Sequence, residues 1–278
     1  MITVRALWGA SHPGPSVVVT VLAVALGVAA GLEPWRIVVL GLAVLCGQLS
    51  VGISNDAIDH DRDTAVGRTD KPLVRGEVSV RTAWIAAVAA VAVALVLSAF
   101  LGVGMLVAHA VTLASAWSYN VGLKATPLSI APFLVSFGVF PSLATLSAAQ
   151  PAVAAGWAWI AGAALGAAVH LTNVLPDLED DRRTGVRGFA HRMGARPAAA
   201  LAGLAVLAGA AAVLWGAADA GALGPVAWIL FAGVAALAVA TVLRVMVRAP
   251  DRVVFRLVMA AALLLAVQLV ASPGSLAV

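Results

Sequence analysis

Long apolar segments recur along the whole of this sequence, and polar connections of varying length separate them. A helix that crosses the hydrocarbon core of a bilayer needs roughly 17–25 predominantly apolar residues, and these segments reach that length. With boundary errors of roughly 2–4 residues, the segments are 15–32, 36–54, 80–99, 102–118, 127–147, 153–172, 198–217, 222–243 and 254–272. The pattern predicts nine transmembrane helices.

The composition of these segments favours helices over strands. They are rich in Ala, Leu and Val and lack the two-residue alternation of a membrane β-barrel. A helix also satisfies every backbone polar group internally, which lipid requires. Only 11% of the residues are charged, against about 25% in a typical soluble domain. We therefore expect an all-α, polytopic membrane protein that forms a single domain over residues 1–278.

Basic residues gather on one side of this predicted bundle. With nine spans, 16 of the 17 Lys and Arg residues lie on connections that face the same side, and only Arg36 faces the other. This asymmetry is the positive-inside pattern of membrane proteins. It predicts an integral protein of the cytoplasmic membrane with a cytoplasmic N-terminus. It also explains the net charge of +4 by contact with membrane lipids, so neither a nucleic acid nor a protein partner is inferred.

Most of the 13 acidic residues lie in two short segments. The first segment ends the second predicted span. A helix turns 100° per residue, so the polar residues Asn55, Asp56, Asp59 and Asp63 fall within an arc of about 100°. Asp61 points nearly the opposite way. The first segment therefore presents three carboxylates and one amide on one helix face.

The second acidic segment, residues 177–181, ends the sixth predicted span. There His170, Asn173, Asp177 and Asp181 share a face about 80° wide. Long polar connections, 64–79 and 182–197, follow the two acidic segments, and connections longer than about 8 residues are often functional lids. We expect these connections to form caps on the cytoplasmic side.

Carboxylates at the carboxyl end of a helix oppose its dipole, so this placement costs stability unless a cation binds there. Ionisable residues near membrane depth are also expensive and mark functional sites. Hard oxygen ligands suit Mg²⁺, which takes one or two carboxylates together with substrate phosphates. The two faces therefore predict a site for a magnesium-chelated diphosphate. The alternative is a pair of solvated helix ends that neighbouring arginines neutralise.

Three motifs in this order resemble those of the UbiA superfamily of intramembrane prenyltransferases. Asn55-Asp56-x-x-Asp59-x-x-x-Asp63 is similar to the first aspartate motif of that family, and Asp177-x-x-x-Asp181 is similar to the second. Between them, Tyr119 and Lys124 resemble a Tyr and Lys element that follows the fourth span. The resemblance implies a helical bundle around a central cavity, cytoplasmic cap loops, Mg²⁺ as cofactor, and a prenyl diphosphate as substrate.

The resemblance also implies roles for individual residues. The expected metal ligands are Asn55, Asp56, Asp59, Asp63, Asp177 and Asp181. The expected diphosphate-binding residues are Asn55, Arg68, Lys71, Arg75, Lys124 and Asn173. The expected catalytic residues are Asp59, Asp181, Lys124 and Tyr119.

General chemistry agrees with this reaction. Breaking the C–O bond of a prenyl diphosphate builds negative charge on the diphosphate and an allylic cation on the tail. Metal ions and preorganised basic groups stabilise the diphosphate charge. A hydrophobic cavity lets the cation meet its nucleophile before it meets water.

Two polar residues are candidates for binding the acceptor of the prenyl group. Gln48 lies two turns before Asn55 and either points into the cavity or bonds a neighbouring helix. His170 shares the second acidic face and either contacts substrate or is a satisfied bundle histidine. His12 and His109 are weaker candidates. A charged aromatic acid would need a fixed cation near the cavity, and no basic residue lies clearly within a span, so a neutral or lipid-like acceptor stays open.

Three classes of function fit these observations. The first is transfer of the prenyl group to an aromatic, quinone-precursor or lipid acceptor. The second is a terpene cyclase on the same scaffold, although an aromatic content of 6% makes a cavity with many cation-stabilising rings hard to assemble. The third is an ion-coupled transporter, because buried carboxylates also mark ion pathways. Carboxylates grouped at one level argue against a path that crosses the bilayer.

Overall fold

The computed structural model describes residues 2–174, 187–248, 251–271 and 276–277. Within those ranges the protein is helical, and an isolated bridge between Ala154 and Ala277 is the one β-type pairing. This confirms the expected all-α class for the described part of the chain. Asp177 and Asp181 lie outside the described residues, as does the first part of the second predicted cap.

A helix lies at each of the nine expected apolar segments. These helices are α2 (Pro13–Ala29), α3 (Pro34–Ala65), α4 (Val80–Leu101), α5 (Val103–Val121), α6 (Ala131–Thr145), α7 (Gly156–Val174), α10 (Ala195–Asp219), α11 (Pro225–Val247) and α12 (Arg252–Ala271). Three short elements were not expected. They are α1 (Ile2–Ala10), the 3₁₀ helix η1 (Leu123–Ala125) and α9 (Phe189–Met193).

Length and composition divide these helices into two groups. Five helices (α3, α4, α10, α11 and α12) are long and apolar enough to cross a membrane on their own, and the bent pair of α1 and α2 makes a sixth if it counts as one span. The helix α6 has only 15 residues. A multi-pass membrane protein is therefore supported by the described residues, while the count of nine spans stays a prediction.

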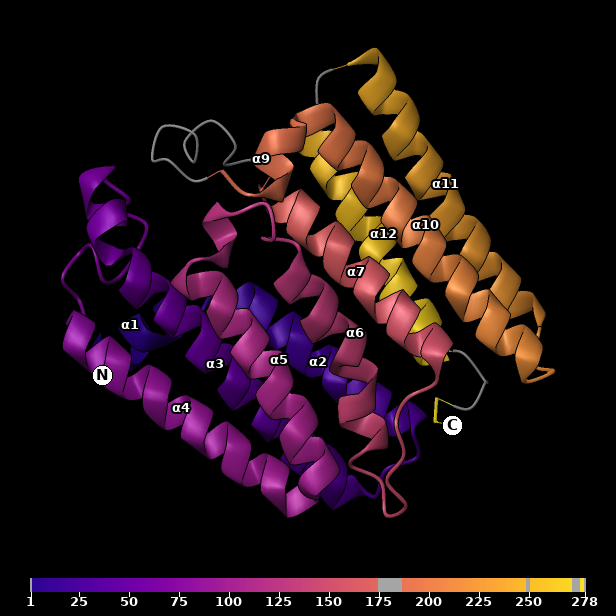
Figure 1. Ribbon diagram of the computed structural model, residues 1–278, viewed down its shortest axis with the longest axis horizontal. Helices are drawn as coiled ribbons and strands as arrows, with labels where there is room; N and C mark the ends of the chain where they lie inside the picture. Colours follow the sequence, from indigo (N-terminus) through magenta and orange to yellow (C-terminus); the bar gives the residue numbers. More distant parts are fainter. Residues whose placement is uncertain (1, 175–186, 249–250, 272–275, 278) are drawn as a thin grey trace.

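The helices pack as one bundle in which neighbours in sequence are mostly neighbours in space (Figure 1). The helix α2 contacts α3 and α6 and also reaches α12, so the two ends of the bundle meet. Leu26, Leu40, Leu143 and Leu171 from four different helices are almost completely buried in its core. Large apolar side chains on the outer faces are exposed, such as Phe100, which suits contact with lipid.

The helix α3 begins at Pro34, where a missing backbone N–H costs nothing. It runs for 32 residues, well past the expected end of the apolar segment at residue 54. The first acidic segment is therefore part of a continuous helix, which fixes the relative directions of its carboxylates.

A sharp bend of 71° separates α1 from α2. At this bend His12 has a φ of 53°, the left-handed conformation that is uncommon outside glycine. The bend presses closely against α3 at Gly52, because a Cβ atom there would lie 2.4 Å from the carbonyl oxygen of Ser11. This close approach carries His12 to the face of α3 that bears the carboxylates.

Candidate functional site

Three carboxylates form the centre of the site on α3. The exposed fractions of Asp56, Asp59 and Asp63 are 2%, 6% and 2%, whereas Asp61 is exposed. This burial confirms that helical spacing places the three on one face and Asp61 on another. Buried carboxylates require nearby cations, since an isolated buried charge is very costly.

Lys71 supplies the first of these cations, from the connection between α3 and α4. Its Nζ atom lies 2.8 Å from Oδ1 of Asp56 and 2.7 Å from Oδ2 of Asp63. Burial alone would lower the pKa of Lys71, but the two carboxylates outweigh it and raise that pKa above its ordinary value. Lys71 is therefore held firmly in its charged form.

Lys124 supplies the second cation, from η1. Its ammonium group pairs with Oδ1 of Asp59, and Arg62 pairs with Oδ2 of the same carboxylate at 3.0 Å. Burial lowers the pKa of Lys124 below its ordinary value, although Asp59 opposes that shift. The charge on Lys124 is thus less well compensated than the charge on Lys71.

His12 completes the ring of groups around Asp56. Its Nε2 atom lies 3.0 Å from Oδ1 of Asp56. His12 was only a weak candidate in the sequence, because the residues around it do not predict a bend in the left-handed conformation. A histidine directly before a proline at a helix start was the only available signal.

Asn120 is a further site residue that sequence reasoning missed. Its side-chain amide donates to the carbonyl of Val51 at 2.9 Å and to Oγ of Ser54 at 3.1 Å. Its Oδ1 atom accepts a hydrogen bond of 3.1 Å from the amide of Asn55. Asn120 therefore fixes the end of α5 against α3 and orients Asn55, and its position directly after Tyr119 was the only hint.

Two further expected diphosphate-binding residues, Arg68 and Arg75, lie on the exposed surface of the first cap. Arg68 pairs with Asp70 at 2.9 Å, and Arg75 pairs with Glu77 at 2.6 Å. The guanidinium of Arg68 lowers the pKa of Asp70 to about 2. The structure thus brings Lys71 and Lys124 to the carboxylates of α3, and Arg68 and Arg75 each pair with an acidic residue of the first cap.

The described residues suit a magnesium-bound phosphate better than a closed metal site. No three metal-ligating side chains converge within the described ranges. Mg²⁺ usually takes one or two carboxylates and completes its shell with waters and substrate phosphates. Asp56, Asp59 and Asp63 supply oxygen ligands of that kind, so the donor chemistry fits Mg²⁺ that arrives with a phosphate.

A cavity of about 330 Å³ begins beside the carboxylates and extends into the bundle. The α1–α2 bend and helices α3, α5, α6 and α7 form its walls. His12 and Asn55 line the cavity and also belong to the carboxylate cluster. Asn173 lines it from α7, and Tyr119 lines it from α5. A substrate with a charged head and an apolar tail could therefore occupy both regions.

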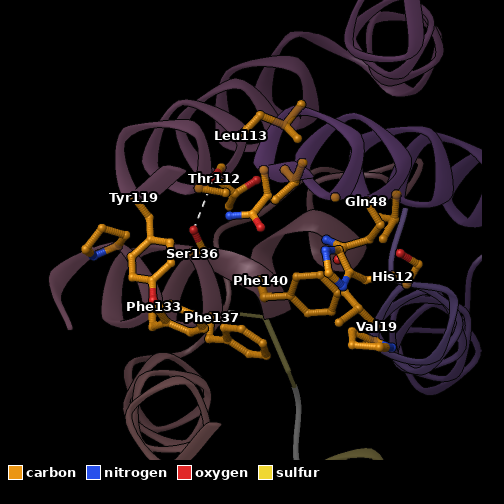
Figure 2. A pocket seen from close by; sticks show the side chains of 18 of the residues that line it. His12, Val19, Gln48, Thr112, Leu113, Tyr119, Phe133, Ser136, Phe137 and Phe140 are labelled. Atoms are coloured by element: carbon orange, nitrogen blue, oxygen red, sulfur yellow. Dashed lines mark hydrogen bonds between the residues drawn. The ribbon is translucent and has the colours of Figure 1, made fainter. Parts of the chain in front are cut away.

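One side of the cavity is aromatic. Figure 2 shows the rings of Phe133, Phe137 and Phe140 in a row along α6. Tyr119 meets Phe133 edge to face, with ring centroids 5.1 Å apart. Four aromatic rings therefore line the cavity although the aromatic content is only 6%, because the spacing of the three phenylalanines places them on one helix face.

The two candidate acceptor-binding residues have different positions. Gln48 lines the cavity, which agrees with the interpretation that its side chain points into the cavity. His170 is only 1% exposed and is not among the described lining residues. Its Nε2 atom lies 3.2 Å from Oγ of Ser129, which accepts a 2.8 Å hydrogen bond from the backbone N–H of Phe189. His170 thus contacts the point where the second cap returns to the bundle.

The model of the UbiA prenyltransferase family matches residues 16–273. No curated protein sequence shows significant similarity to this chain. Solved structures share the fold at low sequence identity. A digeranylgeranylglyceryl phosphate synthase structure has a TM-score of 0.77 at 12% identity, covering 98% of this chain and 99% of the other.

Two structures of UbiA homologs are also similar. A UbiA homolog from Aeropyrum pernix K1 has a TM-score of 0.75 at 20% identity, covering 92% of this chain and 96% of that one. A UbiA homolog from Archaeoglobus fulgidus, bound to GPP and Mg²⁺, has a TM-score of 0.72 at 17% identity, covering 96% and 99%.

Proposed function

This chain belongs to the UbiA prenyltransferase family, and we propose that it transfers the prenyl group of a prenyl diphosphate to a hydrophobic acceptor inside the membrane. It is an integral, multi-pass membrane protein. The observation that carries the proposal is the position of the buried carboxylates and two lysines at one end of an aromatic cavity. A prenyl diphosphate matches this arrangement, because it carries its charge at one end and an apolar chain at the other.

The diphosphate end of the site consists of the carboxylate cluster and its cations. In this proposal Asp56, Asp59 and Asp63 of α3, together with Asp177 and Asp181, hold Mg²⁺. When bound, Mg²⁺ neutralises the phosphate oxygens and so favours departure of the diphosphate. The homolog from Archaeoglobus fulgidus is bound to GPP and Mg²⁺, which supports Mg²⁺ and a prenyl diphosphate as the ligands.

Lys124 is the residue best suited to meet the departing diphosphate. Burial lowers the pKa of Lys124 although Asp59 opposes that shift, so a second anion, the diphosphate, would stabilise its charged form further. Lys71 is already compensated by two carboxylates. As the C–O bond breaks, its electron pair goes to the diphosphate, and Lys124 can donate to that oxygen.

The cavity governs the fate of the allylic cation. Phe133, Phe137 and Phe140 present ring faces and edges but no nucleophile, and they exclude water. The acceptor attacks the terminal carbon of the prenyl group, a new bond forms, and a proton leaves the acceptor. Tyr119 lies where the cavity meets the connection that carries Lys124, next to the reacting end.

Cyclisation of the prenyl group is the second candidate, and the aromatic wall favours it. Ring faces stabilise a cation within about 6 Å of the ring centroid, and three phenylalanines in a row offer several such positions. In that case the double bonds of the substrate, rather than a second molecule, capture the cation.

One experiment separates the two candidates. Purified protein in lipid is incubated with Mg²⁺ and prenyl diphosphates of increasing length, with and without neutral and acidic acceptors, and products are identified by mass. Transfer predicts slow hydrolysis alone and a heavier conjugate once an acceptor is added. A cyclic hydrocarbon or terpene alcohol released at a steady catalytic rate without acceptor would contradict transfer.

A further inference from the structure

The inner end of the cavity, far from the carboxylates, carries His109 and Gln48. His109 of α5 is 3% exposed and packs over Gly47 of α3. Gln48 is the next residue of α3, and both His109 and Gln48 line the cavity. Gly47 precedes Asn55 by two helical turns, which is roughly 12 Å along the helix axis.

A hydrogen-bond chain fixes the tautomer of His109. Ser98 donates its hydroxyl hydrogen to the carbonyl of Ala94 at 2.7 Å. The same hydroxyl oxygen lies 2.7 Å from Nδ1 of His109. A hydroxyl has a single hydrogen, so at Nδ1 it acts as the acceptor and His109 is the donor. Nδ1 therefore carries the proton, and Nε2 keeps a free lone pair.

The lone pair of Nε2 has no partner among the described residues. A Cβ atom on Gly47 would lie 2.9 Å from Nε2, so the glycine leaves the space in which His109 sits. The amide of Gln48 likewise has no hydrogen-bond partner in the described part of the chain. Both residues line the cavity, so a ligand there can restore the hydrogen bonds that these polar groups would otherwise make with water. Two such groups in one cavity indicate a ligand that pairs with them.

The cavity offers no charge to a ligand at this depth. None of its described lining residues is Lys, Arg, Asp or Glu. His12 lies at the opposite, carboxylate end and pairs with Asp56. A carboxylate carried into the inner cavity would lose its hydration without gaining a cation, which is strongly unfavourable.

We propose that the acceptor is an uncharged, hydroxyl-bearing molecule whose inner end is anchored by His109 and Gln48. Its hydroxyl donates to Nε2 of His109, and the amide of Gln48 binds the same group or its neighbour. The atom that receives the prenyl group faces the carboxylate end. Ser98 acts through His109, as a positioning residue that fixes the tautomer. The inference rests on the proposed transfer reaction, since it names the acceptor of that reaction.

Three naphthols test the anchor directly with geranyl diphosphate as donor. They share a hydroxyl at one end and carry hydroxyl, methoxy or carboxylate at the other: 2,6-dihydroxynaphthalene, 6-methoxy-2-naphthol and 6-hydroxy-2-naphthoic acid. The diol is expected to have a KM about three- to tenfold below that of the methoxy compound, the usual effect of one hydrogen bond. The acid is expected to be the poorest acceptor of the three.

Variants test whether His109 causes the difference in KM between the diol and the methoxy compound. His109→Phe keeps a ring over Gly47 but removes Nε2. The KM values for the diol and for the methoxy compound should therefore become equal, and the KM for geranyl diphosphate should stay unchanged. Ser98→Ala should weaken the discrimination by freeing the tautomer. Thr112→Val is the matched control, because the Thr112 hydroxyl already donates to the carbonyl of His109 at 2.8 Å. Discrimination that survives in His109→Phe would overturn the proposal.

A second readout does not depend on turnover. The ¹⁵N spectrum of histidine-labelled protein in lipid nanodiscs should show His109, identified by its loss in His109→Phe, with a protonated Nδ1 and an unprotonated Nε2. Addition of 2,6-dihydroxynaphthalene should move the Nε2 signal, and 6-methoxy-2-naphthol should not. A protonated Nε2, or no response to the diol, would refute the anchor. Absence of any conjugate from any acceptor would instead count against prenyl transfer itself.

Discussion

The Nζ atom of Lys71 lies 2.8 Å from Oδ1 of Asp56, a carboxylate 15 residues earlier in the chain. The same ammonium reaches Asp63, about two helical turns further along the face of α3. A Mg²⁺ that binds the two carboxylates through these same oxygens would displace the ammonium. A displaced Lys71 would then stand beside the incoming phosphates, where its positive charge remains useful.

Lys124 should contribute more to catalysis than other basic residues of the same side. Lys124→Ala removes a charge from the site that receives the departing diphosphate, a loss of about 2–4 kcal/mol of transition-state stabilisation by comparison with other preorganised groups. We expect the turnover rate to fall roughly 30- to 1000-fold. Arg248 is exposed beyond the end of α11 and serves as control. If Lys124→Ala and Arg248→Ala lowered the turnover rate equally, Lys124 would serve only to set the orientation in the membrane.

Asp59 and Asp61 form a matched pair two residues apart. Asp59 is buried in the cluster and Asp61 is exposed on the opposite face. Asp59→Asn keeps the shape but removes the charge, and we expect turnover to fall on the order of 100-fold or more. Asp61→Asn should be nearly neutral. Steady-state rates and thermal unfolding of both variants check this, and a similar loss in the two would contradict the assignment.

Gly52 should be essential for the position of His12. A side chain at Gly52 collides with the backbone of Ser11, so Gly52→Ala has to displace the α1–α2 bend. We expect a loss of about 1–3 kcal/mol of stability together with reduced turnover. Gly14 also lies beside the bend, and a Cβ atom added to it would meet nothing within 4 Å, which makes Gly14→Ala the control. Thermal unfolding in detergent should separate the two variants, and equal stability would argue against the packing account.

The distribution of basic residues predicts the orientation in the membrane. In a Cys46→Ala background, a cysteine in place of Arg75 should react with an impermeant reagent only after the cytoplasmic face is exposed. A cysteine in place of Asp219, at the end of α10, should react from outside. Labelling of both positions from one side would contradict the nine-span topology.

The sequence predicted best what helical periodicity controls. Asp56, Asp59 and Asp63 lie on one arc because α3 is continuous through the acidic segment, and burial of the three agrees with that arc. Residues on connections were harder to place. Lys71 and Arg75 lie only four positions apart, yet one joins the carboxylates and the other pairs with Glu77. An irregular connection has no period from which this choice could be read.

The residues that line the cavity were hard to predict from the sequence for a different reason. In a helix that is apolar on all sides, such as α6, the lipid-facing and core-facing residues have the same character. The spacing of Phe133 and Phe137 shows that they share one face of α6, but it does not show that this face points into the bundle. His12 depends on a left-handed backbone conformation, and His109 on the absence of a side chain at Gly47, and both are properties of the packed bundle.

Binding of labelled geranyl diphosphate to the purified protein in lipid nanodiscs tests the central claim most directly. The account predicts saturable binding in Mg²⁺, loss of binding in EDTA, recovery when excess Mg²⁺ is restored, and strongly weakened binding in Asp59→Asn but not in Asp61→Asn. Binding that persists undiminished in EDTA, or that is unaffected by Asp59→Asn, would contradict a magnesium-dependent diphosphate site on the carboxylate face of α3.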